Sequence, residues 1–147
     1  MGLDMYLSAK RYLSQYDDQD KEVIASVSSM PIQRGNLRPK EITYEAMYWR
    51  KANAIHGWFV DNVQAGEDDC GEHYVSIEKL QELVALCLSV IKSRDPSMLP
   101  PTSGFFFGST DVDDYYYEDL EQTARALTKL LETPDIDDFT FHYRASW

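Results

Sequence analysis

Four polar residues that could do chemistry lie within one aromatic stretch of the sequence, residues 49–58. With the two tryptophans beside them they form one candidate ligand-binding site: Trp49, Arg50, Lys51, Asn53, His56 and Trp58. A cation in apolar surroundings needs an acid, a ligand or solvent as its partner. Cations beside aromatic rings therefore predict a pocket that holds a small anionic ligand. The alternative is that Arg50 and Lys51 pair with nearby carboxylates and extend their charged ends into water.

The positive charge of this site continues towards the N-terminus. Residues 34–51 hold more bases than acids, with Arg34, Arg38, Lys40, Arg50 and Lys51 against Glu41 and Glu45. A cationic pocket with aromatic walls suits a phosphorylated ligand that contains a ring. The sequence thus predicts that the chain sequesters a small nucleotide-like ligand.

Other polar groupings carry weaker signals. The stretch 104–110 lacks the glycine patterns of phosphate-binding loops, so we expect a structural turn there. Cys70 and His73 have the spacing of zinc ligands but no second pair, so no metal and no cofactor are expected. No pattern marks a catalytic nucleophile, and only the fold could bring Cys70 to His56. Binding is therefore favoured over catalysis, and an enzyme with an unrecognised site stays an alternative.

The segment from Asp111 to Glu121 is strongly acidic and contains no base. Such a segment could engage a basic protein by imitating the phosphates of nucleic acid. The tyrosines Tyr115–Tyr117 would add contact energy if they were exposed. The alternative is a solvated helix face whose acids suit the positive end of the helix dipole.

The elements that must position these groups follow from hydrophobic periodicity. Residues 3–13 alternate and predict a strand, and residues 14–40 predict a long loop with short structure at 21–28. Residues 41–64 place aromatic and aliphatic side chains at helical spacing, which predicts a long, central, buried helix. Residues 65–75 are expected to form a loop.

The second half of the chain predicts two more helices and two strands. Ser76 is a suitable N-cap for a helix that ends before Pro96, and Asp111–Asp114 open a third helix that Pro134 ends. Residues 105–107 and 139–144 read as short strands. The chain is thus expected to be a single α+β domain, residues 1–147, with a small, mostly antiparallel sheet packed by about three helices on one face.

Composition bounds the class of protein. The chain has 147 residues, a net charge of -11 and 13% aromatic residues. A chain of this length can bury a hydrophobic core of useful size. Its negative charge argues against direct binding to nucleic acid or to anionic lipid. Two cysteines, Cys70 and Cys87, do not make a secreted disulfide scaffold, and no apolar run approaches a membrane span, so we expect a cytoplasmic protein.

Several segments carry a resemblance to a group of small, uncharacterised bacteriophage and prophage proteins that begin Met-Gly-Leu-Asp-Met-Tyr-Leu. The matching segments are residues 1–7, 48–56, 58–60, 69–71, 74–76 and 103–110. The resemblance implies a phage accessory protein in the cytosol of the host, such as one that counteracts host defence. It assigns no catalytic residue. The two binding alternatives are then a small anionic ligand or a basic host protein, and a homo-oligomer is left open.

Overall fold

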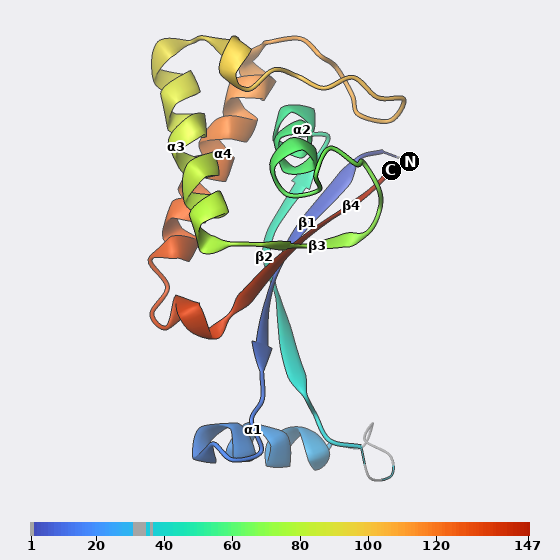
Figure 1. Cartoon of the computed structure of the whole chain (residues 1–147), viewed down its shortest axis with the longest axis vertical. Helices are drawn as coiled ribbons and strands as arrows, with labels where there is room; N and C mark the ends of the chain where they lie inside the picture. Colours follow the sequence, from blue (N-terminus) through green and yellow to red (C-terminus); the bar gives the residue numbers. More distant parts are fainter. Residues whose placement is uncertain (1, 31–34, 36) are drawn as a thin grey trace.

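The strands of the protein form one antiparallel sheet in the spatial order β2-β1-β4-β3 (Figure 1). The computed structural model describes residues 2–30, 35 and 37–147. The strands are β1 (Asp4–Tyr12), β2 (Glu41–Arg50), β3 (Glu72–Val75) and β4 (Thr140–Ser146). The α+β class and the antiparallel sheet predicted from the sequence are therefore confirmed.

Strand β1 organises the sheet because it pairs with β2 on one side and with β4 on the other. Its Met5, Leu7 and Ala9 are buried, as the alternation in the sequence predicts. Their partners on β4 are Ala145, Tyr143 and Phe141, which are buried as well. A register shift between Leu7 and Ser8 marks an irregularity in the pairing with β2.

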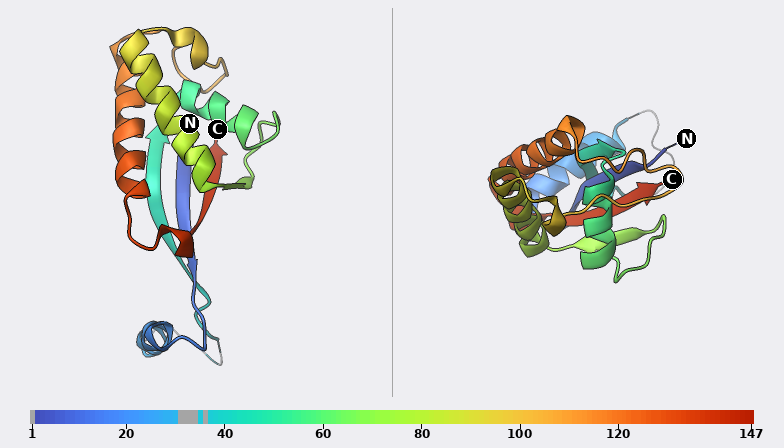
Figure 2. Two further views of the ribbon diagram at one scale, coloured as in Figure 1. Left: turned by 60° about the vertical axis from the view of Figure 1, so that its left-hand side comes forward. Right: turned by 90° about the horizontal axis from the view of Figure 1, so that it is seen from above.

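Three helices pack against this buried face of the sheet: α2 (Asn53–Asn62), α3 (Ile77–Ser93) and α4 (Asp114–Leu131). The fourth helix is α1 (Asp18–Ser28), and short 3-10 turns lie at Pro96–Met98 and Ile136–Asp138. Figure 2 shows α3 and α4 side by side, with α2 crossing near the ends of the strands. The predicted cap is confirmed, since the Ser76 side chain accepts from the Lys79 amide, and Asp113 caps α4 in the same way.

Helix α1 lies away from this body. The ribbon of β1 and β2 extends beyond the other strands and carries α1 at its tip (Figure 1). The carboxylate of Asp20 holds the helix to the ribbon, because it accepts from the Ser14 amide and pairs with Arg11 at 2.8 Å. The short structure predicted at 21–28 is confirmed as part of this helix.

The long helix predicted over residues 41–64 is wrong. Residues 41–50 form β2, Lys51 turns the chain with a left-handed φ of 57°, and only Asn53–Asn62 are helical. The apolar residues of 41–50 fit helical spacing, but they also alternate in part, as in a strand. Aromatic side chains favour strands where a partner strand is available. Pairing with β1 over the whole length of β2 therefore decided the outcome.

Two shorter predictions also differ from the structure. Residues 105–107 are not a strand but part of a turn, in which the Phe107 amide donates to the Gly104 carbonyl. The loop predicted at 65–75 contains β3, which pairs with β4. The predicted final strand is confirmed as β4. None of the described helices has the length and apolar character to cross a membrane.

One buried hydrogen bond joins the sheet to α4 and gives a test of the fold. The indole Nε1–H of Trp49 donates to Thr123 Oγ1 at 2.8 Å, with both side chains buried. Thr123→Val leaves this indole without its acceptor, so we expect a loss of stability of about 1–3 kcal/mol. Urea unfolding measures the loss. The double variant Trp49→Phe/Thr123→Val, which removes both partners, should lose less than the sum of the two single variants.

Candidate functional site

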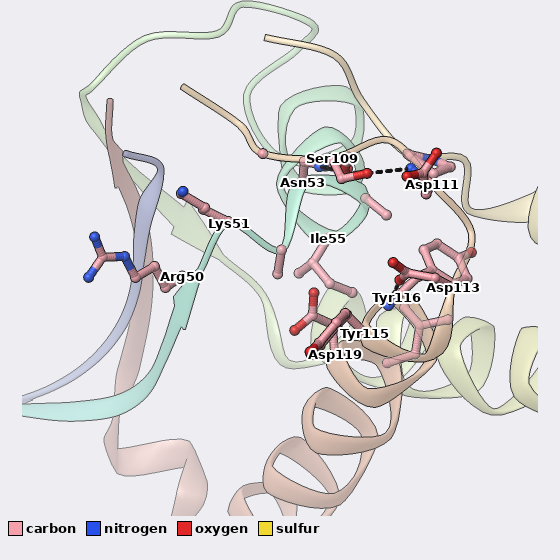
Figure 3. Close-up of a pocket in the computed structure, with 15 residues that line it drawn as sticks. Arg50, Lys51, Asn53, Ile55, Ser109, Asp111, Asp113, Tyr115, Tyr116 and Asp119 are labelled. Carbon is pink, nitrogen blue, oxygen red and sulfur yellow. Dashed lines mark hydrogen bonds between the residues drawn. The ribbon is translucent and has the colours of Figure 1, made fainter. Parts of the chain in front are cut away.

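A pocket of about 290 Å³ lies between the start of α2, the start of α4 and the loop before α4. Its polar and charged lining residues are Arg50, Lys51, Asn53, Ser109, Asp111, Asp113, Tyr115, Tyr116 and Asp119 (Figure 3). Ile55 and Leu120 form part of its apolar floor. A concave site with a few convergent polar groups is a usual place for a ligand or a partner side chain.

The left-handed turn at Lys51 directs the chain from β2 into this pocket. The Lys51 amide donates to the Leu3 carbonyl, and the Asn53 amide donates to the Lys51 carbonyl. A β-carbon on Gly108 would meet the Lys51 side chain at 3.3 Å, so the missing side chain of this glycine leaves room for the lysine stem. Gly108 itself has a positive φ of 86°, which a glycine adopts without strain.

The buried amide of Asn53 fixes the loop that forms the upper wall. Its Nδ2 donates to the carbonyls of Phe107 and Ser109, at 3.1 and 2.8 Å, and its Oδ1 accepts from the Thr102 amide at 3.1 Å. Three bonds from one side chain hold both ends of the loop over α2. The wall is thus preformed, although the loop has no regular secondary structure.

Three aspartates give the pocket a negative interior. Asp113 is engaged as the N-cap of α4, and Asp111 lies on the exposed rim. The carboxylate of Asp119 has neither a hydrogen bond nor an ion pair among the residues that the structure describes. Burial, and then the charges of Glu118 and Asp113, raise the pKa of Asp119 to about 6. The pocket therefore contains a partly buried carboxylate that lacks a counter-charge.

Two tyrosines border this carboxylate and differ in role. The hydroxyl of Tyr116 donates to the Leu99 carbonyl at 2.6 Å, and its ring is buried, so it ties α4 to the segment before the loop. Tyr115 is 76% exposed at the mouth of the pocket. An exposed aromatic ring beside an unpaired acid can stack on a planar cation.

The two cations of the predicted site do not neutralise these acids. Arg50 and Lys51 are exposed, and Figure 3 shows their charged ends directed away from Asp113 and Asp119. Arg50 stands opposite Asp4 and, like Tyr48, on the face of the sheet away from the helices. The premise that both cations are buried in a helix is therefore wrong, because the residues lie on a strand and a turn. Their role as ligand-binding residues stays a prediction.

The other four residues of the predicted site are buried and have partners inside the protein. Trp49 bonds to Thr123, and Asn53 holds the loop, as described above. Trp58 packs edge-on against Phe59, with ring centroids 5.2 Å apart. His56 is 0% exposed and lies between two partners, with Nδ1 2.7 Å from the Tyr143 hydroxyl and Nε2 3.1 Å from Asp68 Oδ1.

The partners of His56 indicate which of its ring nitrogens accepts a hydrogen bond and which donates one. Burial, and then the charge of Asp68, raise the pKa of Tyr143 well above its usual value, so its hydroxyl stays protonated. A hydroxyl that donates to Nδ1 leaves Nε2 to carry the ring proton and to donate to Asp68. The three groups thus form a hydrogen-bonded chain from the core to the surface.

Three of the six predicted residues, Arg50, Lys51 and Asn53, line this pocket, but Asp119 was not among the predicted residues. Asp119 lay within the acidic segment that was interpreted as a possible surface for a basic partner. A sharper signal was available, since Asp119 stands three residues after Tyr116 and four before Thr123, both on the buried face of α4. An acid at the border of an apolar helix face is poorly solvated.

The remaining predicted groupings have separate places in the fold. Cys70 is exposed, Cys87 is buried, and both thiols are free. His73 bonds to Asp69 at 2.7 Å rather than to Cys70. Across residues 2–30, 35 and 37–147, no three His, Cys, Asp or Glu side chains are grouped so that they could hold a metal ion.

Comparison with known proteins adds no function to this geometry. No protein-family model, no curated protein and no solved structure matches the chain.

The raised pKa of Asp119 predicts that removing its charge stabilises the protein. Above about pH 6 the ionised carboxylate disfavours folding, and the cost vanishes below the pKa of an unfolded aspartate, about 3.9. After a discount for partial exposure, Asp119→Asn should gain about 1 kcal/mol near pH 7.5 and nothing near pH 4. Urea unfolding at both pH values measures the gain.

Asp114→Asn provides the matched control for this experiment. It removes the same charge from the exposed first turn of α4, where an acid suits the helix dipole, so it should cost a few tenths of a kcal/mol. A gain from Asp119→Asn that is equal at both pH values would contradict the assignment.

Proposed function

We propose that the protein acts by binding and that its pocket around Asp119 receives a cationic side chain of a basic protein partner. The resemblance to phage accessory proteins would make that partner a host protein. The observation that carries the proposal is the unpaired carboxylate of Asp119, which lies partly buried in a preformed pocket. A charge that the fold keeps without a partner, at a cost in stability, is typical of a site that is completed from outside.

The lining of the pocket suits a guanidinium or ammonium group. Asp119 and Asp113 supply carboxylate oxygens, and Ser109 supplies a hydroxyl. Charge-assisted bonds from a guanidinium to carboxylates are among the stronger hydrogen bonds in proteins. Tyr115 at the mouth adds a ring over which the stem or the plane of the cation can lie. The net charge of -11 attracts a basic partner to the protein as a whole.

A small anionic ligand was the first expectation from the sequence, and the interior of the pocket does not favour it. The carboxylates of Asp113 and Asp119 point into the cavity, while the charged ends of Arg50 and Lys51 point away from them (Figure 3). An anion there would face Asp113 and Asp119 in a poorly solvated space, which is repulsive. Catalysis is less favoured, because no described base or nucleophile is hydrogen-bonded to Asp119.

The proposal is tested with a short arginine-rich peptide, titrated by calorimetry and followed by NMR signals of α4. We expect one saturable site, and Asp119→Asn should weaken it by about tenfold or more. Asp114→Asn removes the same negative charge outside the pocket and should change the affinity by less than about twofold. The affinity should also fall as the pH is lowered through about 6, where Asp119 takes up a proton.

Two results would decide against the pocket. Equal losses from the two variants would mean that the peptide binds through general attraction to an acidic protein. Saturable binding of ATP, included as an anionic probe and lost on Lys51→Ala, would support the small-ligand alternative instead.

A further inference from the structure

A second cleft, of about 300 Å³, uses the same loop but faces the C-terminal end of β4. Asp68 provides its carboxylate, and Phe105, Phe106, Phe107 and Trp147 provide aromatic walls. Figures 1 and 2 both show this loop running beside the C-terminus of the chain. The function proposed above does not use this cleft.

The carboxylate of Asp68 is held in position by two side chains, His56 and Trp147. Its Oδ1 lies 3.1 Å from His56 Nε2 and accepts from Trp147 Nε1–H at 3.2 Å. Oδ2 has no hydrogen bond or ion pair among the described residues. His56 is completely buried and is held in turn by Tyr143 at 2.7 Å. The chain of hydrogen bonds therefore orients one carboxylate and leaves half of its bonding capacity for the cleft.

Two of the four aromatic rings of the cleft are exposed, while Phe107 is buried. Phe105 is 94% exposed and Trp147 is 44% exposed. The rings of Phe105 and Phe106 meet at 88° with centroids 4.7 Å apart, and those of Phe107 and Trp147 meet at 65° with centroids 6.3 Å apart. The rings in each pair meet at a steep angle rather than in a closed stack, so the exposed ring of Phe105 and the partly exposed indole of Trp147 remain accessible to a ligand.

The wall that carries these rings is rigidly supported. Asn53 holds the carbonyl of Phe107, and the Leu3 amide donates to the carbonyl of Phe106. A β-carbon on Gly104 would lie 2.5 Å from the ring of Phe107, so the ring packs directly on this glycine. Phe105 is 94% exposed on this fixed loop and has Phe106 and Trp147 beside it in the cleft, and a contiguous apolar patch of this kind is typical of a binding surface.

We propose that this cleft is a binding site for an organic cation of the quaternary-ammonium class. The group carries a positive charge spread over methyl groups, so it needs apolar and π-electron surroundings more than hydrogen-bond acceptors. The accessible rings of Phe105 and Trp147 supply those surroundings, and the fixed carboxylate of Asp68 supplies the opposite charge. A primary ammonium or guanidinium, in contrast, is better satisfied by the carboxylates and hydroxyl of the Asp119 pocket.

The test compares choline with its neutral isostere, 3,3-dimethylbutan-1-ol. The two molecules have nearly the same shape, so a difference in binding reports the charge. We expect choline to shift the NMR signal of the Trp147 indole N–H in a saturable way, and to bind at least about tenfold more tightly than the alcohol. Tryptophan fluorescence gives a second measure of the same equilibrium.

Three single variants test whether choline binds in this cleft. Asp68→Asn keeps an oxygen for the two N–H donors and removes the charge, and it should weaken choline binding by about tenfold. Glu67→Gln removes the neighbouring charge outside the cleft and should leave the affinity unchanged. Phe105→Ala removes an exposed ring without disturbing the core, so it should weaken binding while the unfolding midpoint stays the same.

Other outcomes would overturn the proposal. Equal affinity for choline and the alcohol would show a merely apolar cleft, and equal losses from Asp68→Asn and Glu67→Gln would show general attraction to negative charge. Asp119→Asn should bind choline like the unmodified protein. If it does not, the cation enters the Asp119 pocket, and the present assignment is wrong while the proposed function is not.

Discussion

The side-chain amide of Asn53 is the contact on which both clefts depend. It is the first residue of α2, and it binds three backbone groups of the loop that crosses above that helix. The loop has no regular secondary structure. Without the bonds to Asn53, its backbone groups would bond only to water, and the loop could adopt many conformations. With these bonds in place, one side of the loop borders the acidic pocket and its tip carries the exposed phenylalanine rings. The geometry of two surfaces thus follows from one buried side chain.

The ion pairs of the protein are distributed unevenly over its surface. Lys10 pairs with Glu72, and Arg11 pairs with Asp20 at 2.8 Å, so several bases serve the sheet and the ribbon. The acids around the start of α4 receive no such partners among the described residues. A fold that placed Lys51 over Asp119 would have gained a salt bridge and closed the pocket. Instead, the chain turns at Lys51, and the Asp119 carboxylate stays without an ion pair among the described residues, at a cost in stability.

The sequence predicted the elements that local signals define and failed where distant contacts decide. The alternation in β1, the cap at Ser76 and the acidic start of α4 are local, and all three are found in the structure. The stretch 41–64 fits helical spacing as well as partial alternation, and only the pairing of β2 with β1 separates the two. For the candidate site, sequence spacing identified His56 and Asn53 as polar residues in apolar surroundings. It could not show that Tyr143, Asp68 and the loop already satisfy them.

The central place of β1 has a consequence for how the chain is made. Strand β2 leaves the ribosome soon after β1 and is its neighbour on one side, yet the neighbour of β1 on the other side is β4, residues 140–146, which is made much later. At a synthesis rate of about 5–20 residues per second, one edge of β1 waits several seconds without hydrogen-bonding partners. An unpaired strand edge in a nascent chain invites wrong pairing. Early capture of β1 by β2, with α1 already formed at the tip of their ribbon from local contacts, would shield at least one edge during that interval.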